Sequence, residues 1–246
     1  MCYETKSGSK KPALVRTIGM MGALLALAGS PASSEGPAGD EEGFVSLFNG
    51  KDLTGWQARR LEKKGYVVEK GCLVCPADGG GFLFSEKEYA DFILRLEFKL
   101  SKRANNGIAI RSPLVKESPA YEGIEIQVLD DPRYEGQLKP AQYHGSVYDV
   151  IPAKRGALKP VGEWNQQEIV CRGRHIRVVL NGETILDADL DKIKDAELLR
   201  KHPGLARTKG HIGFLGHGSR VEFRNVRIKE LMPPRRKQTS SSPPAR

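Results

Sequence analysis

Two short stretches of the chain place polar side chains at every second residue, the spacing that puts them on one face of a β-strand. In residues 123–131 (GIEIQVLDD), Glu125 and Gln127 alternate with aliphatic residues. In residues 106–111 (NGIAIR), two isoleucines alternate with small residues and with Arg111. If the two strands are neighbours, Arg111, Glu125 and Gln127 share a polar face opposite the core. A guanidinium, a carboxylate and an amide on one surface are the residue types of a binding or catalytic site.

Further polar residues can lie on the same side of the sheet. Asp130 ends the first stretch, and His144 and Tyr148 lie in a long region of little regular pattern, residues 132–163. A connection that long inside a compact domain is usually functional, and its aromatic residues suit a wall or lid over a binding face. His217 lies in a predicted turn between two glycines, which leave its imidazole unshielded.

Each of these residues also has a purely structural interpretation. Arg111 and Glu125 could form a cross-strand ion pair on a solvated face, which typically contributes under about 1 kcal/mol. Gln127 could be an ordinary exposed polar residue of a strand. The chain has no Gly-x-Ser-x-Gly, no phosphate-binding glycine loop and no His-Glu-x-x-His motif, so the common catalytic signatures do not decide between the interpretations.

The elements that position these residues are predicted to be almost entirely β-strands. Residues 92–100 (FILRLEFKL) alternate apolar and charged side chains, and Asn181-Gly182 between two alternating runs is a strong hairpin signal. The stretch 190–202 is the one plausible helix, ended by Pro203-Gly204. Ten or more strands with one short helix predict an all-β fold, a two-sheet antiparallel β-sandwich or jelly roll.

The two ends of the chain differ from its body. Residues 1–32 have a basic stretch, an apolar run and a small-residue cleavage site, which predicts a signal peptide; a membrane anchor or a misassigned start codon is the alternative. Residues 33–42 are predicted to be a disordered linker, residues 43–231 the folded domain, and residues 232–246 a disordered basic tail. We therefore expect the protein to be exported to the periplasm or the medium, with no membrane attachment after the signal peptide is cleaved.

Most of the net charge of +9 belongs to these ends. Residues 1–32 contribute a net +3 and residues 232–246 a net +4, which leaves +2 for the body. A body so near neutrality does not have the charge of a nucleic-acid-binding surface, so we expect no nucleic-acid partner. Cleavage would leave three cysteines, Cys72, Cys75 and Cys171. We interpret them as structural, with a disulfide that involves Cys171 as the alternative.

Six segments in order along the chain resemble one known family. They are GFVSLFNGKDLTGW (43–56), DFILRLEFKL with NNGIAIR (91–111), GIEIQVLDD (123–131), HGSVYDVIPA (144–153), GEWNQQEIVCRGRHIRVVLNG (162–182) and GHIGFLGHGSRVEFRNVRIKEL (210–231). Together they resemble the 3-keto-disaccharide hydrolase family, a concanavalin-A-like jelly roll common in secreted bacterial proteins. The chain departs from the family at Gly216, where an acidic residue is frequent, and residues 189–209 look longer than usual.

The resemblance implies a carbohydrate substrate whose C3 hydroxyl has been oxidised to a ketone. The ketone acidifies the C2 proton, so that a base can remove it, the enolate can expel the C1 substituent, and water can add afterwards. On this chain the resemblance implies Glu125 or His217 as the base and Arg111, with or without a divalent metal, as the oxyanion partner. Asn106 and Gln127 would hold hydroxyls, with His144 or Tyr148 near the leaving group.

Two questions stay open from the residues alone. The first is whether a divalent metal takes part, for which Asp130, Glu125 and His217 are the candidate ligands. The second is whether the domain is catalytic at all, because jelly rolls also serve as carbohydrate-binding modules or as scaffolds without a ligand.

Overall fold

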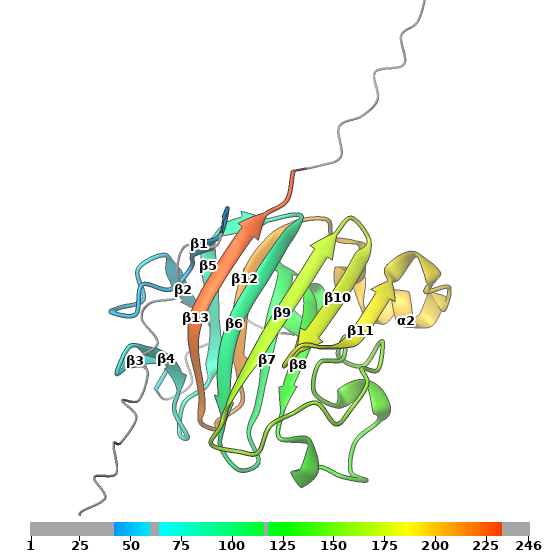
Figure 1. Cartoon of the computed structure of the whole chain (residues 1–246). Helices are drawn as coiled ribbons and strands as arrows, with labels where there is room; N and C mark the ends of the chain where they lie inside the picture. Colours follow the sequence, from blue (N-terminus) through cyan, green and yellow to red (C-terminus); the bar gives the residue numbers. More distant parts are fainter. Residues whose placement is uncertain (1–41, 60–63, 116–117, 233–246) are drawn as a thin grey trace, which may run out of the picture. The chain divides into compact units, whose positions relative to one another are not determined.

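The computed structural model of the chain describes residues 42–59, 64–115 and 118–232, and the described part contains thirteen strands in two antiparallel sheets (Figure 1). The larger sheet has eight strands. They are β11 (Glu183–Asp189), β10 (His175–Leu180), β9 (Trp164–Arg172), β6 (Phe92–Leu100), β13 (Val221–Glu230), β4 (Cys72–Cys75) and β3 (Val67–Glu69) in spatial order, with β1 (Val45–Ser46) paired to β13.

The smaller sheet has five strands and packs against the larger one. Its order is β2 (Trp56–Arg59), β5 (Gly81–Tyr89), β12 (Gly210–Gly216), β7 (Asn105–Ser112) and β8 (Ile124–Leu129). In Figure 1 the strands β10, β9, β6 and β13 lie in front, with β12, β7 and β8 behind them. The predicted two-sheet antiparallel sandwich is therefore confirmed.

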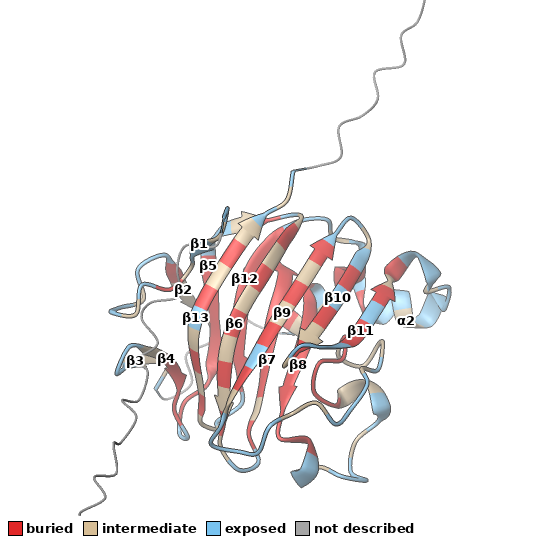
Figure 2. Ribbon diagram, viewed as in Figure 1, coloured by how far each residue is buried: buried red, intermediate tan, exposed pale blue. Residues whose placement is uncertain are grey.

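The alternation of β6 shows why the sequence forms this sandwich. Phe92, Leu94, Leu96 and Phe98 are buried between the sheets, and the charged residues between them face outward, so the strand is striped in Figure 2. Aromatic residues fill the space between the sheets. The ring of Phe214 from β12 lies 4.4 Å from that of Phe223 on β13, measured between ring centroids.

The predicted helix 190–202 is shorter in the structure. It begins as a 3-10 turn (Leu190–Lys192), becomes extended at Ile193, and restarts as α2 (Ala196–Lys201). The restart has a local cause, because the carboxylate of Asp195 accepts hydrogen bonds from the backbone N–H groups of Glu197 and Leu198 at 2.9 and 3.0 Å. A second, single-turn helix that the sequence did not indicate is α1 (Pro119–Glu122).

The predicted signal peptide, all but one residue of the predicted linker and all but one residue of the predicted tail lie outside the described residues. Among the residues that are described, no helix is long and apolar enough to cross a membrane. Cys72, Cys75 and Cys171 are free thiols, so the alternative of a disulfide at Cys171 is not realised among them. Burial raises the pKa of the Cys171 thiol to about 12, which makes it an inert core residue.

Candidate functional site

A pocket of about 270 Å³ lies on the outer face of the five-stranded sheet, over the edge strand β8, its neighbour β7 and the end of β12. The single-turn helix α1 forms one wall. Four of the sequence-predicted residues line this pocket: Glu125, Gln127, Tyr148 and His217. Its other lining residues are Phe82, Asn105, Ser118, Pro119, Ala120, Tyr121 and Leu215.

Glu125 is the most unusual of these residues. It is the second residue of β8, opposite Ala109 of β7, and it is only 4% exposed. Within the described residues its carboxylate has no hydrogen-bond or ion-pair partner. Burial alone raises the pKa of this carboxyl group to about 8. A carboxyl group that exchanges its proton near neutral pH is suited to proton transfer.

The space for the Glu125 side chain is provided by Gly107 on the neighbouring strand. The two strands pair antiparallel, with Gly107 opposite Gln127. A Cβ atom on Gly107 would lie 1.8 Å from Glu125 Oε1, far inside any allowed contact. Only glycine leaves the carboxyl group its present position over β7.

Gln127 and Asn105 form an amide pair at the base of the pocket. Gln127 Nε2 donates a hydrogen bond to Asn105 Oδ1 at 3.3 Å, which leaves Gln127 Oε1 buried and without a partner in the described structure. Gln127 is only 3% exposed. A buried acceptor without a donor is costly, so this oxygen is suited to accept a hydrogen bond from a ligand hydroxyl.

The turn that carries His217 is fastened to the same amide pair. Asn105 N–H donates to Ser219 Oγ at 2.7 Å, and Ser219 Oγ donates to the Asn105 carbonyl at 2.9 Å. Gly218 has a φ of +77°, which lets the chain turn sharply after His217. His217 is exposed at the mouth of the pocket, where its imidazole can reach a bound molecule.

Tyrosine side chains complete the wall of the pocket. The segment with Tyr148 runs along the edge of β8, and Tyr148 N–H donates to the Glu125 carbonyl at 3.0 Å. Burial, followed by the nearby Tyr121 and Glu125, raises the pKa of the Tyr148 hydroxyl, so the group stays protonated at neutral pH. Tyr121 of α1 stacks on the buried ring of His202 with ring centroids 4.7 Å apart.

Arg111 does not reach the pocket. β7 and β12 slip out of register between His211 and Gly213, and Arg111 has a left-handed backbone with φ of 50°. This bulge breaks the simple alternation and sends the guanidinium away from Glu125. There it donates to the carbonyls of Ala90 (3.0 Å) and Gly173 (2.7 Å) and pairs with Asp91 at 3.0 Å, fully buried.

Asn106 and His144 also lie away from the pocket. Asn106 has the same strand parity as Ile108 and therefore faces the space between the sheets, where its side chain hydrogen-bonds the hydroxyl of Tyr66 at 3.0 Å. His144 stacks on Phe98 and contacts Gln167 at 3.0 Å. Burial lowers the pKa of His144 to about 4, so it is a neutral residue of the interior.

Asp130 is separated from the other candidate metal ligands. Its carboxylate accepts the backbone N–H of Arg103 at 2.7 Å, and it does not line the pocket. In the part of the chain that the structure describes, no three His, Cys, Asp or Glu residues are grouped so that they could hold a metal ion. The structure therefore does not bring together the ligand set of Asp130, Glu125 and His217.

Seven of the eleven lining residues were not among the sequence candidates, and Asn105 and Tyr121 are two of them. Strand parity could have identified Asn105, because it alternates with Asn106 and shares the face of Gly107 and Ala109. Tyr121 had no such signal, since its position depends on a four-residue helix that the sequence pattern did not indicate.

The fold and the site together define the class of protein. It is a concanavalin-A-like β-sandwich with a small pocket on the outer face of one sheet that contains a buried carboxyl group, an amide pair and a histidine. Residues 43–229 match the 3-keto-alpha-glucoside-1,2-lyase-like domain. The chain therefore belongs to that family, which confirms the resemblance found in the sequence.

Individual relatives agree with this assignment. The chain is 30% identical over 234 residues to the 3-keto-disaccharide hydrolase of Bacteroides thetaiotaomicron strain VPI-5482, covering 78% of this chain and 80% of the relative. A crystal structure of a "putative glycosyl hydrolase" from Parabacteroides distasonis superposes with a TM-score of 0.67 at 29% identity, covering 78% of this chain and 95% of the other. A second from the same organism gives 0.66 at 29% identity, with 76% and 99% covered.

Proposed function

We propose that this protein cleaves the glycosidic bond of 3-keto-glycosides or 3-keto-disaccharides. The main support is the Glu125 carboxyl group, which is buried in a pocket of about 270 Å³ with no partner among the described residues and with its pKa raised to about 8. A pocket of this size lies near the lower end of small-molecule sites, which suits one sugar ring with the rest of the substrate outside. The family and the name of the Bacteroides relative, a 3-keto-disaccharide hydrolase, support the same substrate class.

The first chemical step is removal of the C2 proton. The ketone at C3 acidifies this proton, and the ionised Glu125 carboxylate accepts it while the C–H electrons form an enolate on the C3 oxygen. The Arg111 guanidinium is bound to Gly173 and Asp91 away from the pocket, so the enolate oxygen needs other hydrogen-bond donors. The side-chain amide of Asn105 and the Tyr148 hydroxyl are the donors in the pocket for this role.

The second step is departure of the C1 substituent. The enolate electrons re-form the ketone, a C1–C2 double bond forms, and the C1–O bond breaks. His217 or Tyr148 gives the leaving oxygen its proton. Water then adds at C1 and a proton at C2, which gives the free 3-keto sugar. During all of these steps, Gln127 Oε1 accepts a hydrogen bond from a sugar hydroxyl and so holds the sugar ring over Glu125.

We also propose that the mature protein acts outside the cytoplasm, because residues 1–32 have the pattern of a signal peptide. Sequencing the N-terminus of the protein purified from its own host tests this. A mature start near Ser33 supports export, and an intact start at Met1 contradicts it.

The second candidate function is a carbohydrate-binding module without turnover. The absent acidic residue before His217 favours it, since Gly216 can contribute neither a ligand nor a hydrogen-bonding side chain. The pocket would then bind a sugar through Gln127 and Asn105 alone.

One experiment separates the two functions. The purified protein is incubated in D₂O with a 3-keto-α-glucoside and with the unoxidised glucoside, with and without a chelator. The lyase proposal predicts release from the 3-keto substrate only, with deuterium at C2 of the early product. Binding without release supports the module, and a product that keeps its C2 proton contradicts the elimination mechanism.

A further inference from the structure

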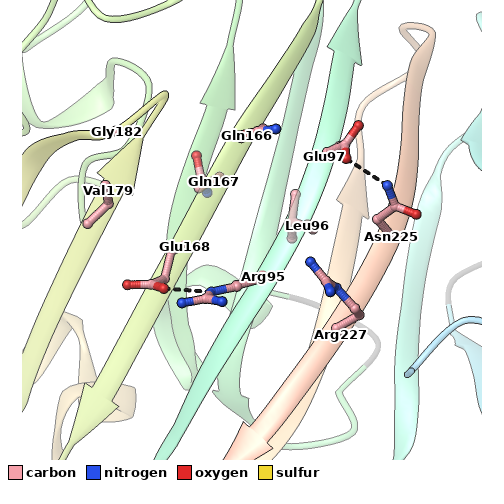
Figure 3. A pocket seen from close by; sticks show the side chains of 10 residues that line it. All are labelled: Arg95, Leu96, Glu97, Gln166, Gln167, Glu168, Val179, Gly182, Asn225 and Arg227. Atoms are coloured by element: carbon pink, nitrogen blue, oxygen red, sulfur yellow. Dashed lines mark hydrogen bonds and ion pairs between the residues drawn. The ribbon is translucent and has the colours of Figure 1, made fainter. Parts of the chain in front are cut away.

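A second pocket lies on the outer face of the eight-stranded sheet, on a different sheet from Glu125. It is a groove of about 320 Å³ across β13, β6, β9 and β10, shown in Figure 3. Its floor is the backbone around Leu96 and Gln167, and its polar rim carries six residues: Arg95, Glu97, Gln166, Glu168, Asn225 and Arg227.

The unusual feature of this groove is a pair of guanidinium groups on adjacent strands. Arg95 of β6 lies directly opposite Arg227 of β13 in the antiparallel register. Like charges at directly opposite positions are destabilising unless an anion compensates them. Each of the two arginines therefore needs an acidic partner to compensate its charge.

Only one of the two arginines has such a partner. Arg95 Nε donates to Glu168 at 2.8 Å. Arg227 forms no ion pair within the described residues, and its Nε atom is buried without a hydrogen-bond acceptor. Its guanidinium carbon lies 5.9 Å from the centre of the Phe44 ring, which offers no acceptor oxygen.

The two carboxylates of the groove are already occupied. Glu168 is shared between Arg95 and Arg177, the latter at 3.5 Å. Glu97 accepts from Arg224 at 2.7 Å and from Asn225 Nδ2 at 2.6 Å, as the dashed line in Figure 3 shows for Asn225. No rim carboxylate is left over for Arg227.

A β-bulge places Arg227 and Asn225 at the groove. The register of β13 against β6 shifts between Arg224 and Arg227, and Asn225 has a left-handed backbone with φ of 51°. Bulges of this kind re-aim side chains and are frequent beside functional sites. Here the bulge presents beside Asn225 a cation that has no ion pair among the described residues, while the amide of Gln166 lies farther along the same groove.

We infer that this groove binds a sugar-sized molecule that carries an anionic group, either a carboxylate or a sulfate. The anion accepts hydrogen bonds from the Arg227 guanidinium, which supplies the missing acidic partner. Asn225 and Gln166 offer amides for the neighbouring hydroxyls. The inference is independent of the reaction proposed for the Glu125 pocket, because the two pockets share no lining residue.

Calorimetric titration of the full chain with glucuronate, glucose 6-sulfate and glucose at constant low salt tests the inference. The wild-type protein should bind at least one of the two acidic sugars about tenfold more tightly than glucose, and which one binds identifies the anion. Arg227→Gln should weaken that binding at least tenfold, and Arg227→Lys, which keeps the charge without the planar guanidinium, should fall between.

Lys229→Gln is the matched control. Lys229 lies on the same outer face of β13 and carries the same charge, but it does not line the groove. This variant should change the affinity less than twofold, and the melting temperatures of all variants confirm that they are folded. The inference is overturned if neither acidic sugar binds, or if Arg227→Gln binds them as tightly as the wild type or as Lys229→Gln.

Discussion

The chemistry at the residue scale depends on the environment of a single carboxyl group. Glu125 is buried in the sheet, and among the described residues neither a cation nor a hydrogen-bond donor compensates its charge. It is therefore mostly protonated at neutral pH and ionises near pH 8. A group with this behaviour accepts a proton more readily as the pH rises.

The pH dependence of turnover follows from this pKa. If the ionised Glu125 is the base, kcat/KM for a 3-keto-glucoside should rise about tenfold per pH unit below the pKa and level off above about 8. Initial rates between pH 5.5 and 9.5 measure it. A rate that falls through the same range would assign Glu125 as the general acid instead.

Gly107 has no side chain, and this leaves room for the carboxyl group of Glu125. Gly107→Ala should lower kcat/KM by at least a hundredfold, because the new Cβ would lie 1.8 Å from Glu125 Oε1 and must displace it. Gly80→Ala is the control, since its Cβ would come no closer than 3.5 Å to any atom. Equal activity of the two variants would contradict the role given to Gly107.

The bulge in β7 decides, at the scale of the element, which polar residues reach the site. Arg111 lies just beyond the regular part of the strand and connects the turn at Ala90–Asp91 to the turn at Gly173. Its guanidinium is fully buried, so its removal takes a donor from the carbonyls of Ala90 and Gly173 and leaves the Asp91 carboxylate with the Gly173 N–H but without its cation.

Arg111→Gln is therefore predicted to act on stability and not on the reaction. Breaking this buried pair should cost about 3–5 kcal/mol of unfolding free energy, measured by urea denaturation. The kcat of the protein that remains folded should stay within about twofold of the wild type. A large loss of kcat at unchanged stability would contradict this prediction and would indicate that Arg111 stabilises the enolate oxygen in the reaction.

Strand alternation predicted the elements well and the site only in part. It placed Glu125 and Gln127 correctly on the face opposite the core, because β8 is regular over its whole length. It failed for Arg111, whose bulge is a property of the pairing with β12 and not of the local sequence. For Asn106, alternation with Ile108 indicates the core-facing side, where the structure places its side chain against Tyr66.

The long region 132–163 shows the limit of sequence analysis at the scale of the whole molecule. The sequence indicated a wall over the site, and Tyr148 does contribute to one. The orientation of His144 could not be predicted, because it depends on Phe98 and Gln167 from the other sheet. The sandwich itself was predictable from alternation and turn residues, since many strands repeat the same signal.

His144 should make the whole molecule sensitive to acid. Its pKa is about 4 in the folded protein and about 6.5 when unfolded, so the unfolded chain binds the proton more tightly. The stabilising effect is present above pH 6.5 and is lost as the pH falls through 4, with a slope of up to about 1.4 kcal/mol per pH unit. His144→Gln keeps polar groups at this position without the titration.

Denaturation of both proteins between pH 7.5 and 3.5 measures the effect. The stability of the wild type should fall faster than that of His144→Gln below pH 6.5, and the difference isolates this residue from other titrating groups. Parallel curves over the whole range would mean that His144 is not buried as a neutral residue.

In the proposed reaction, Glu125 in the pocket of the five-stranded sheet performs the proton transfer that cleaves a 3-keto-glycoside. The most direct measurement is kcat/KM of Glu125→Gln on a 3-keto-α-glucoside, together with its melting temperature. The predicted result is a loss of at least a thousandfold with a melting temperature equal to or above that of the wild type, because the variant removes an uncompensated buried acid. Turnover within tenfold of the wild type would contradict the claim.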